Sequence, residues 1–72
     1  MEALDEIDQL VLKKLEEGKE PISTYKLAKI TNISWSTINI HCYKLEAMGK
    51  IKSRLETKQI GSRKKRVWNL VK

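Results

Sequence analysis

Positively charged side chains gather near the carboxyl end of this sequence, in the run Arg63-Lys64-Lys65-Arg66. Guanidinium and ammonium groups bind phosphate oxygens, and a run of them displaces the counterions that surround a polyanion. Most charge runs on protein surfaces contact only solvent. This run predicts phosphate contacts because it lies in a predicted β-hairpin beside a predicted helix, and Arg54 and Lys58 belong to the same hairpin.

A second group of candidate side chains lies along that predicted helix, which spans about residues 35–48. Projected at 100° per residue, the face opposite its core residues carries Ser36, Thr37, Ile40, Tyr43, Lys44 and Ala47. Short polar side chains let a helix approach base edges in a major groove, and a lysine further along reaches a phosphate. The pattern therefore predicts a helix that enters the major groove of duplex DNA.

Three side chains of this helix have two interpretations each. Trp35 either packs at the start of the helix or contacts DNA, because its helical angle lies nearer the core side. Ile40 either touches a thymine methyl group or is an ordinary exposed apolar residue. Tyr43 either bonds a phosphate, which we favour, or covers the hairpin.

The elements that position these side chains follow from apolar spacing. A first helix is predicted over about residues 3–17, with Leu4, Ile7, Val11 and Leu15 on one stripe and Gly18 as a left-handed cap. A second helix begins near Ser23 or Thr24, either of which can cap it, and runs to about Thr31. Asn32 ends it in a left-handed conformation, and Ser34 caps the third helix, which ends at Gly49.

Two strands are predicted after the helices. Residues 50–59 alternate between apolar or small and charged side chains, Gly61-Ser62 supplies a turn, and residues 67–71 are β-branched and aromatic. Trp68 and Leu70 are expected to face the helices. The sequence thus predicts one α+β domain over residues 1–72, a winged helix-turn-helix of three helices followed by a two-stranded β-hairpin wing.

The charge is unevenly distributed along the chain, which has a net charge of +6. Residues 1–20 have a balance of −4, and residues 21–72 have a balance of +10. This asymmetry predicts one face for a polyanion and an acidic first helix that faces away from it or toward a partner. With an acidic start and no apolar run long enough for a bilayer, the chain is expected to act away from membranes, in the cytoplasm, and on the nucleoid if it is prokaryotic.

Catalytic and metal chemistry are not expected. Cys42 lies on the core face with no activating base in register, so an inert buried thiol is predicted. His41 has no second ligand at helical spacing, which favours a partly buried structural histidine over a metal ligand. No residues form a nucleophile, base and orienting group, and Gly18, Gly49 and Gly61 are too scattered for a phosphate loop. We predict neither an enzyme nor a cofactor.

One resemblance covers about residues 20–71. The spacing Leu27-Ala28-(3 residues)-Asn32-Ile33-Ser34-(2 residues)-Thr37-Ile38-(6 residues)-Leu45-(3 residues)-Gly49-(1 residue)-Ile51 resembles MarR-, PadR- and ArsR-type winged-helix regulators, and small archaeal and archaeal-virus regulators. The resemblance implies wing contacts with the DNA backbone and base contacts from the start of the third helix. It implicates in DNA binding Ser34, Trp35, Ser36, Thr37, Asn39, Ile40 and Lys44. This sequence lacks the long carboxyl-terminal dimerisation helix of those families.

A narrower resemblance concerns the third helix. The segment Ile38-Asn39-Ile40-His41-Cys42-Tyr43-Lys44-Leu45 is similar to the recognition helix of Z-alpha domains, which bind left-handed DNA. The resemblance implies DNA contacts by Asn39, Tyr43 and Trp68. The wing prolines of that family are absent, since Lys65-Arg66-Val67 precedes Trp68 here, and the wing is longer.

The sequence therefore predicts a transcription regulator, a repressor, that binds double-stranded DNA through the third helix and the wing. Leu10 and Leu12 widen the apolar face of the first helix, which makes a homodimer through that helix plausible. Two alternatives remain besides Z-DNA binding. The chain is instead a winged-helix module that docks an acidic protein, or it binds structured RNA, which the narrow A-form major groove disfavours.

Overall fold

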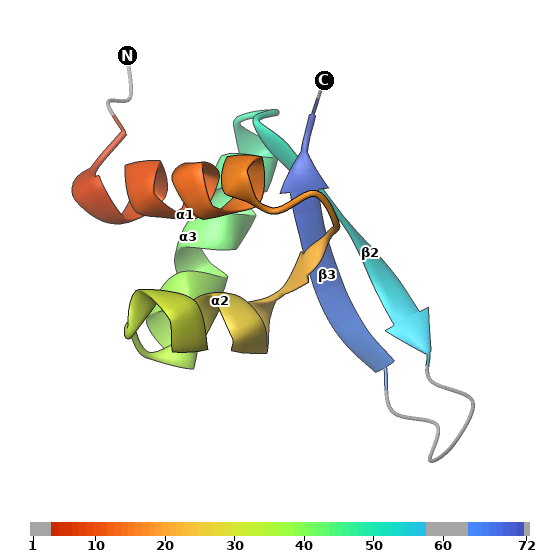
Figure 1. Ribbon diagram of the computed structural model, residues 1–72. Coiled ribbons are helices and arrows are strands. Elements are labelled where there is room, and N and C mark those ends of the chain that lie inside the picture. Colours follow the sequence, from red (N-terminus) through yellow and green to blue (C-terminus); the bar gives the residue numbers. More distant parts are fainter. Residues whose placement is uncertain (1–3, 58–63, 72) are drawn as a thin grey trace.

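The computed structural model describes residues 4–57 and 64–71 (Figure 1). Its elements in chain order are α1 (Glu6–Glu17), β1 (Ile22–Ser23), α2 (Thr24–Thr31), α3 (Trp35–Ala47), β2 (Ile51–Thr57) and β3 (Lys64–Leu70). The helices lie on one side of the molecule, and β2 and β3 extend beyond them as a long antiparallel pair, the wing (Figure 1). The predicted α+β winged helix-turn-helix fold is confirmed.

The sheet has one more strand than the sequence predicted. The short strand β1 pairs with β3, so that Ile22 lies opposite Trp68 and the sheet has the order β1-β3-β2. The predicted two-stranded wing is present as β2 and β3, and β1 is an addition that the sequence did not predict. A strand of two residues is too short to show the period-2 alternation by which strands are recognised. Its pairing joins the segment before α2 to the base of the wing.

Side-chain and backbone caps define the helix ends. Asp5 and Asp8 form a reciprocal capping box at the start of α1, while Ser23 and Ser34 cap α2 and α3 through their hydroxyl groups. As predicted, Asn32 ends α2 in the left-handed region, with φ 58°. These caps fix a short connection between α2 and α3, the two helices of the helix-turn-helix.

The predicted left-handed cap at Gly18 is wrong, because φ there is −79°. A different constraint acts at this position, since a Cβ added at Gly18 would lie 3.0 Å from Cδ1 of Ile22. The close approach lets the chain pass from α1 to β1. Gly49 does adopt a positive φ of 78° at the end of α3, as expected.

The core lies between the helices and the helix-facing side of the sheet. Its buried members are Val11, Leu15, Ile22, Leu27, Ile38, Cys42, Leu45, Ile51 and Trp68. Trp68 is fully buried, and its indole N–H donates a 2.8 Å hydrogen bond to the Thr24 hydroxyl. Leu70 packs against the same core from the end of β3, so the expected inward placement of Trp68 and Leu70 is confirmed.

Leu12, one of the two residues predicted to widen the exposed apolar face of α1, packs against this core. Leu10 is half-buried. The apolar surface that α1 has available for a partner is therefore smaller than the sequence suggested. Within the two described ranges, no helix has the length and apolar composition that crossing a bilayer requires.

Candidate nucleic-acid interface

The helix α3 presents a continuous exposed stripe to solvent. Ser36, Ile40, Tyr43 and Ala47 are exposed, as the helical projection predicts, and Ile40 is 67% exposed. Thr37 is half-buried beside Ser34, whose hydroxyl donates a 2.8 Å hydrogen bond to Oγ1 of Thr37. A helix with the small side chains of Ser36 and Thr37 near its start, and with an outer face that no other element covers, has the shape that a major groove accommodates.

The side chain of Lys44 does not belong to this exposed stripe, because it turns toward α1. Its Nζ atom is 2.6 Å from Oδ2 of Asp8, a fully buried carboxylate on α1, and 3.9 Å from Oδ2 of Asp5. The expectation that Lys44 points outward from α3 toward a phosphate is therefore wrong. The lysine instead joins α3 to α1.

The same carboxylate holds His41, whose Nδ1 atom lies 2.7 Å from Oδ1 of Asp8. Burial alone would raise the pKa of Asp8, but hydrogen bonds from Lys44, His41 and the Asp5 backbone outweigh it and lower the pKa to about 2. Asp8 is thus ionised at neutral pH, and His41 donates to it. The half-buried His41 has the structural role that its position predicted.

The ligand atoms of Asp5, Asp8 and His41 lie within 4.8 Å of one another. Spacing within one helix could not reveal this group, because its members belong to two helices. The ammonium group of Lys44 occupies one oxygen of the central carboxylate, and its positive charge opposes a metal cation there. The neighbouring Cys42 is buried, and burial with the nearby charge of Glu46 raises the pKa of its thiol to about 12, which leaves it protonated and unreactive.

Where α3 meets the wing, an aromatic pair supports a basic side chain. The rings of Tyr43 and Trp68 meet edge to face, with centroids 5.3 Å apart and planes at 89°. The guanidinium of Arg66 lies 5.5 Å from the Tyr43 ring centroid and 5.9 Å from that of Trp68. Its Nη1 also donates a 2.8 Å hydrogen bond to Ser53, which in turn donates to Glu46. Arg66 is therefore held in one orientation.

A shallow hollow of about 470 Å³ lies beside this pair, and we call it the α3–wing concavity. It draws residues from β1, α2, α3 and β3. Its lining consists of Ser23, Thr24, Tyr25, Trp35, Asn39, Tyr43, Lys64, Lys65 and Arg66. Six of the predicted site residues thus meet in one place, three from α3 and three from the wing.

Tyr25 belongs to this site although the sequence analysis did not select it. Its side chain is 64% exposed near the start of α2, and Nζ of Lys29 lies 5.4 Å from the centroid of its ring. The sequence signal that could have identified it is an aromatic residue in the first turn of a capped helix. Only the packing of α2 beside α3 and β3 shows that it lines the same hollow as Trp35.

Arg54 does not join the concavity. It lies opposite Val67 in the wing, one residue out of phase with Ser53, which lies opposite Trp68 and contacts Arg66. Since side chains alternate along a strand, Arg54 belongs to the other face of the wing, where it pairs with Glu56 at 3.4 Å. Lys65 lies opposite Glu56, so its side chain points to that face as well. Lys58 and Arg63 lie outside the described residues.

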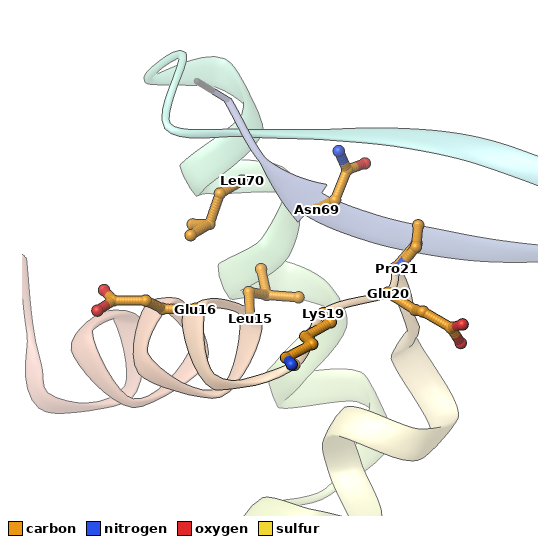
Figure 2. A pocket seen from close by; sticks show the side chains of 8 residues that line it. Leu15, Glu16, Lys19, Glu20, Pro21, Asn69 and Leu70 are labelled. Carbon is orange, nitrogen blue, oxygen red and sulfur yellow. The ribbon is translucent and has the colours of Figure 1, made fainter.

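A second hollow of about 470 Å³ lies at the opposite end of β3, between that strand and the end of α1 (Figure 2). Leu15 and Leu70 form part of its lining, together with Glu16, Lys19 and Glu20. This lining combines acidic, basic and apolar side chains. The basic concavity and this hollow of mixed charge therefore lie at different ends of β3.

The comparisons with known proteins agree with this geometry. The sequence matches the family model described as "HTH domain" over residues 8–65, and no curated protein matches it. A PKZ Zalpha domain in complex with ds(CG)6 is 25% identical, with a TM-score of 0.77 over 93% of this chain and 97% of that one. The apo-Zalpha domain of zebrafish PKZ is 24% identical, with a TM-score of 0.80 over 99% and 100% of the two chains.

Two further solved structures share the fold. A PadR family transcription regulator from Clostridium difficile R20291 is 22% identical, with a TM-score of 0.79 over 93% of this chain and 73% of its own. Stf76 from the Sulfolobus islandicus plasmid-virus pSSVx is 20% identical, with a TM-score of 0.75 over 96% and 86% of the two chains. The predicted resemblances to winged-helix regulators and to Z-alpha domains are confirmed.

Proposed function

Because this chain belongs to the helix-turn-helix (HTH) family of DNA-binding domains, we propose that it binds double-stranded DNA in a sequence-specific manner and represses transcription. The proposal places α3 in the major groove and the basic wing on the neighbouring backbone. The role is recognition, and it involves no catalysis. The observation that carries it is the α3–wing concavity, where Lys64, Lys65 and Arg66 meet the exposed start of α3.

In this arrangement the two parts of the interface have different tasks. The exposed side chains of Ser36 and Ile40 face the bases. A hydroxyl can donate a hydrogen bond to a base edge or accept one from it, and an apolar side chain can contact the thymine methyl group. Lys64 and Lys65, which are exposed, and the positioned Arg66 contact phosphates, which sets register and affinity but carries no sequence information. Lys44 has no part in the interface, because Asp8 holds it against α1.

Base reading by α3 can be tested directly. A preferred duplex is selected from a random pool, and its affinity is compared with that of a random duplex by fluorescence anisotropy. Ser36→Ala and Ile40→Ala are each expected to lower the ratio of the two affinities about fivefold or more, since one base contact gives roughly 1–3 kcal/mol of discrimination. Lys13→Ala, an exposed change on α1, is the matched control. Equal losses on both duplexes would refute base reading by α3.

The number of chains on the selected duplex is a separate part of the proposal. We propose a homodimer through α1, in which half-buried Leu10 contributes to the contact. A dimer would recognise two half-sites separated by about 34 Å or a multiple of it. Sedimentation of the complex distinguishes one chain from two.

A second candidate function is recognition of left-handed duplex DNA. One local arrangement favours it: Asn39 and Tyr43 line the same concavity, and Tyr43 meets Trp68 edge to face. Asn39, Tyr43 and Trp68 are the three positions implicated by the resemblance to Z-alpha domains, and the PKZ Zalpha structure contains ds(CG)6. Trp68 is fully buried, so it can act only by supporting Tyr43 and not by touching DNA. The segment Lys65-Arg66-Val67, which stands where that family has wing prolines, weighs against it.

Circular dichroism separates the two candidates. If the chain selects the left-handed form, titrating it into an alternating CG duplex inverts the long-wavelength DNA band, and Tyr43→Ala abolishes the inversion. A right-handed spectrum that persists at saturation, measured together with binding, excludes this second candidate. The selected mixed-sequence duplex serves as the control, because its spectrum should keep its sign in both cases.

A further inference from the structure

The α3–wing concavity has a feature that contact with a regular duplex does not use. Three aromatic side chains border it and are largely open to solvent: Tyr25 is 64% exposed, Trp35 is 52% exposed and Tyr43 is 44% exposed. A single exposed aromatic residue needs no explanation. Three of them around one hollow, beside the basic side chains of Lys64 and Arg66, form the combination that binds unpaired nucleotides.

The place of the concavity matters as much as its composition. It lies between α3 and the wing, so when these two contact neighbouring grooves it faces the phosphate backbone that separates them. The bases of a paired duplex point away from the backbone toward their partners. Aromatic rings at this point therefore meet sugars and phosphates in a regular duplex, and they meet a base only where a nucleotide has left the stack.

We propose that the α3–wing concavity accepts one unpaired nucleotide of a DNA duplex, as occurs at a bulge. The base stacks between Tyr25 and Trp35, and the flanking phosphate lies against Lys64 and Arg66. This proposal rests on the proposed duplex binding and adds to it the structure of the DNA that the site prefers.

Two contacts prepare the site for such a ligand. Lys29 lies 5.4 Å from the ring centroid of Tyr25, which limits the orientations of that ring. Arg66 is fixed by Ser53 and by the Tyr43–Trp68 pair, so its guanidinium is ordered before a phosphate arrives. A volume of about 470 Å³ lies within the range of pockets that take small organic ligands, which is ample for one nucleotide.

The test uses three hairpin duplexes of one sequence in fluorescence anisotropy: fully paired, with a single-nucleotide bulge, and with the same bulge lacking its base. The bulged duplex is expected to bind at least about fivefold more tightly than the paired one, the low end of the effect of one base stacked on an aromatic side chain. Removing the base from the bulge should abolish this gain, because the phosphate alone does not stack.

Variants then locate the effect. Trp35→Ala and Tyr25→Leu should each abolish the preference for the bulge, measured as the ratio of the affinities for the bulged and the paired duplex, whatever their effect on the paired duplex alone. Ile30→Ala, which removes an apolar side chain 44% exposed on α2 and outside the lining of the concavity, should keep the preference. Circular dichroism of each variant checks the fold. The two substitutions lie on different helices, so if one variant protein unfolds, the other still tests the inference.

The outcomes separate this inference from the proposed function. Equal affinity for the paired and bulged duplexes, or equal affinity for the bulges with and without the base, overturns the inference and leaves duplex binding standing. Absence of binding to the paired duplex overturns the proposed function. A bulge preference that Trp35→Ala and Tyr25→Leu both preserve also overturns the inference, because the base would then stack elsewhere.

Discussion

Replacing Lys64, Lys65 and Arg66 together by glutamine is expected to weaken duplex DNA binding on the order of 100-fold at moderate salt. Each phosphate contact contributes about 1 kcal/mol net, and three lost contacts multiply in the binding constant. Every phosphate contact also releases counterions, so the slope of the logarithm of affinity against the logarithm of salt concentration should fall by about three.

The control for this variant removes the same number of charges elsewhere. Replacing Lys13, Lys14 and Lys19 by glutamine gives a chain with the same net charge, but these lysines belong to the acidic first segment. It should change the affinity only through long-range attraction, which salt screens within about 8 Å under physiological conditions. Anisotropy titrations between 50 and 200 mM salt compare the two variants. Similar losses in both would mean that the wing makes no specific phosphate contacts.

The second large effect concerns stability and depends on Asp8. Asp8→Asn is expected to lower the free energy of unfolding at neutral pH by about 3 kcal/mol. Without the carboxylate charge, the ammonium group of Lys44 and the ring N–H of His41 stay partly buried with no negative charge beside them. The carboxylate is fully buried and contacts both Lys44 and His41 on α3, at 2.6 and 2.7 Å. The control is Glu17→Gln, which breaks an exposed 3.6 Å pair with Lys14 and should cost well under 1 kcal/mol.

The same carboxylate makes stability depend on pH in a defined direction. Its pKa is about 2 in the folded protein and 3.8 for an ordinary aspartate, so the folded state binds this proton more weakly than the unfolded state. The contribution of Asp8 is therefore complete above the ordinary value and lost as the pH falls from about 4 toward 2. A difference of nearly two pKa units corresponds to roughly 2–3 kcal/mol.

Urea unfolding of the natural chain and of Asp8→Asn, measured at neutral pH and at about pH 2, checks both statements. The gap between the two proteins should be large at neutral pH and close to zero at the acidic end. A gap that stays the same at both pH values would show that Asp8 acts through packing and not through its charge. A neutral-pH difference below that of Glu17→Gln would contradict the ionic account altogether.

The sequence predicts the local elements of this fold well, because their signals lie within a few residues. The stripe of Leu4, Ile7, Val11 and Leu15 predicts α1, and the capping residues Ser23 and Ser34 mark the starts of α2 and α3. The two-residue strand β1 was not predicted, because only its pairing with Val67 and Trp68, far along the chain, makes it a strand. Its position depends on tertiary structure.

The candidate site was predicted less completely for the same reason. Helical projection gives the angle of Lys44 on α3 but not the buried Asp8 on α1, 36 residues away, which turns the lysine inward. His41 and Lys44 are three residues apart, so a single acidic side chain can hold both. The aromatic member Tyr25 became part of the site only through the packing of α2 against α3 and β3. Sequence pattern predicts which residues are exposed, but not which of them meet.

Backbone amide chemical shifts, recorded while a short duplex is added to ¹⁵N-labelled protein, test the central claim most directly. If DNA binds at the junction of α3 and the wing, the largest changes fall on Trp35, Asn39, Tyr43 and residues 64–66, and any changes on α1 near Leu10, where the proposed dimer forms, are smaller. Changes concentrated on α1, with α3 and β3 unaffected, would contradict the account.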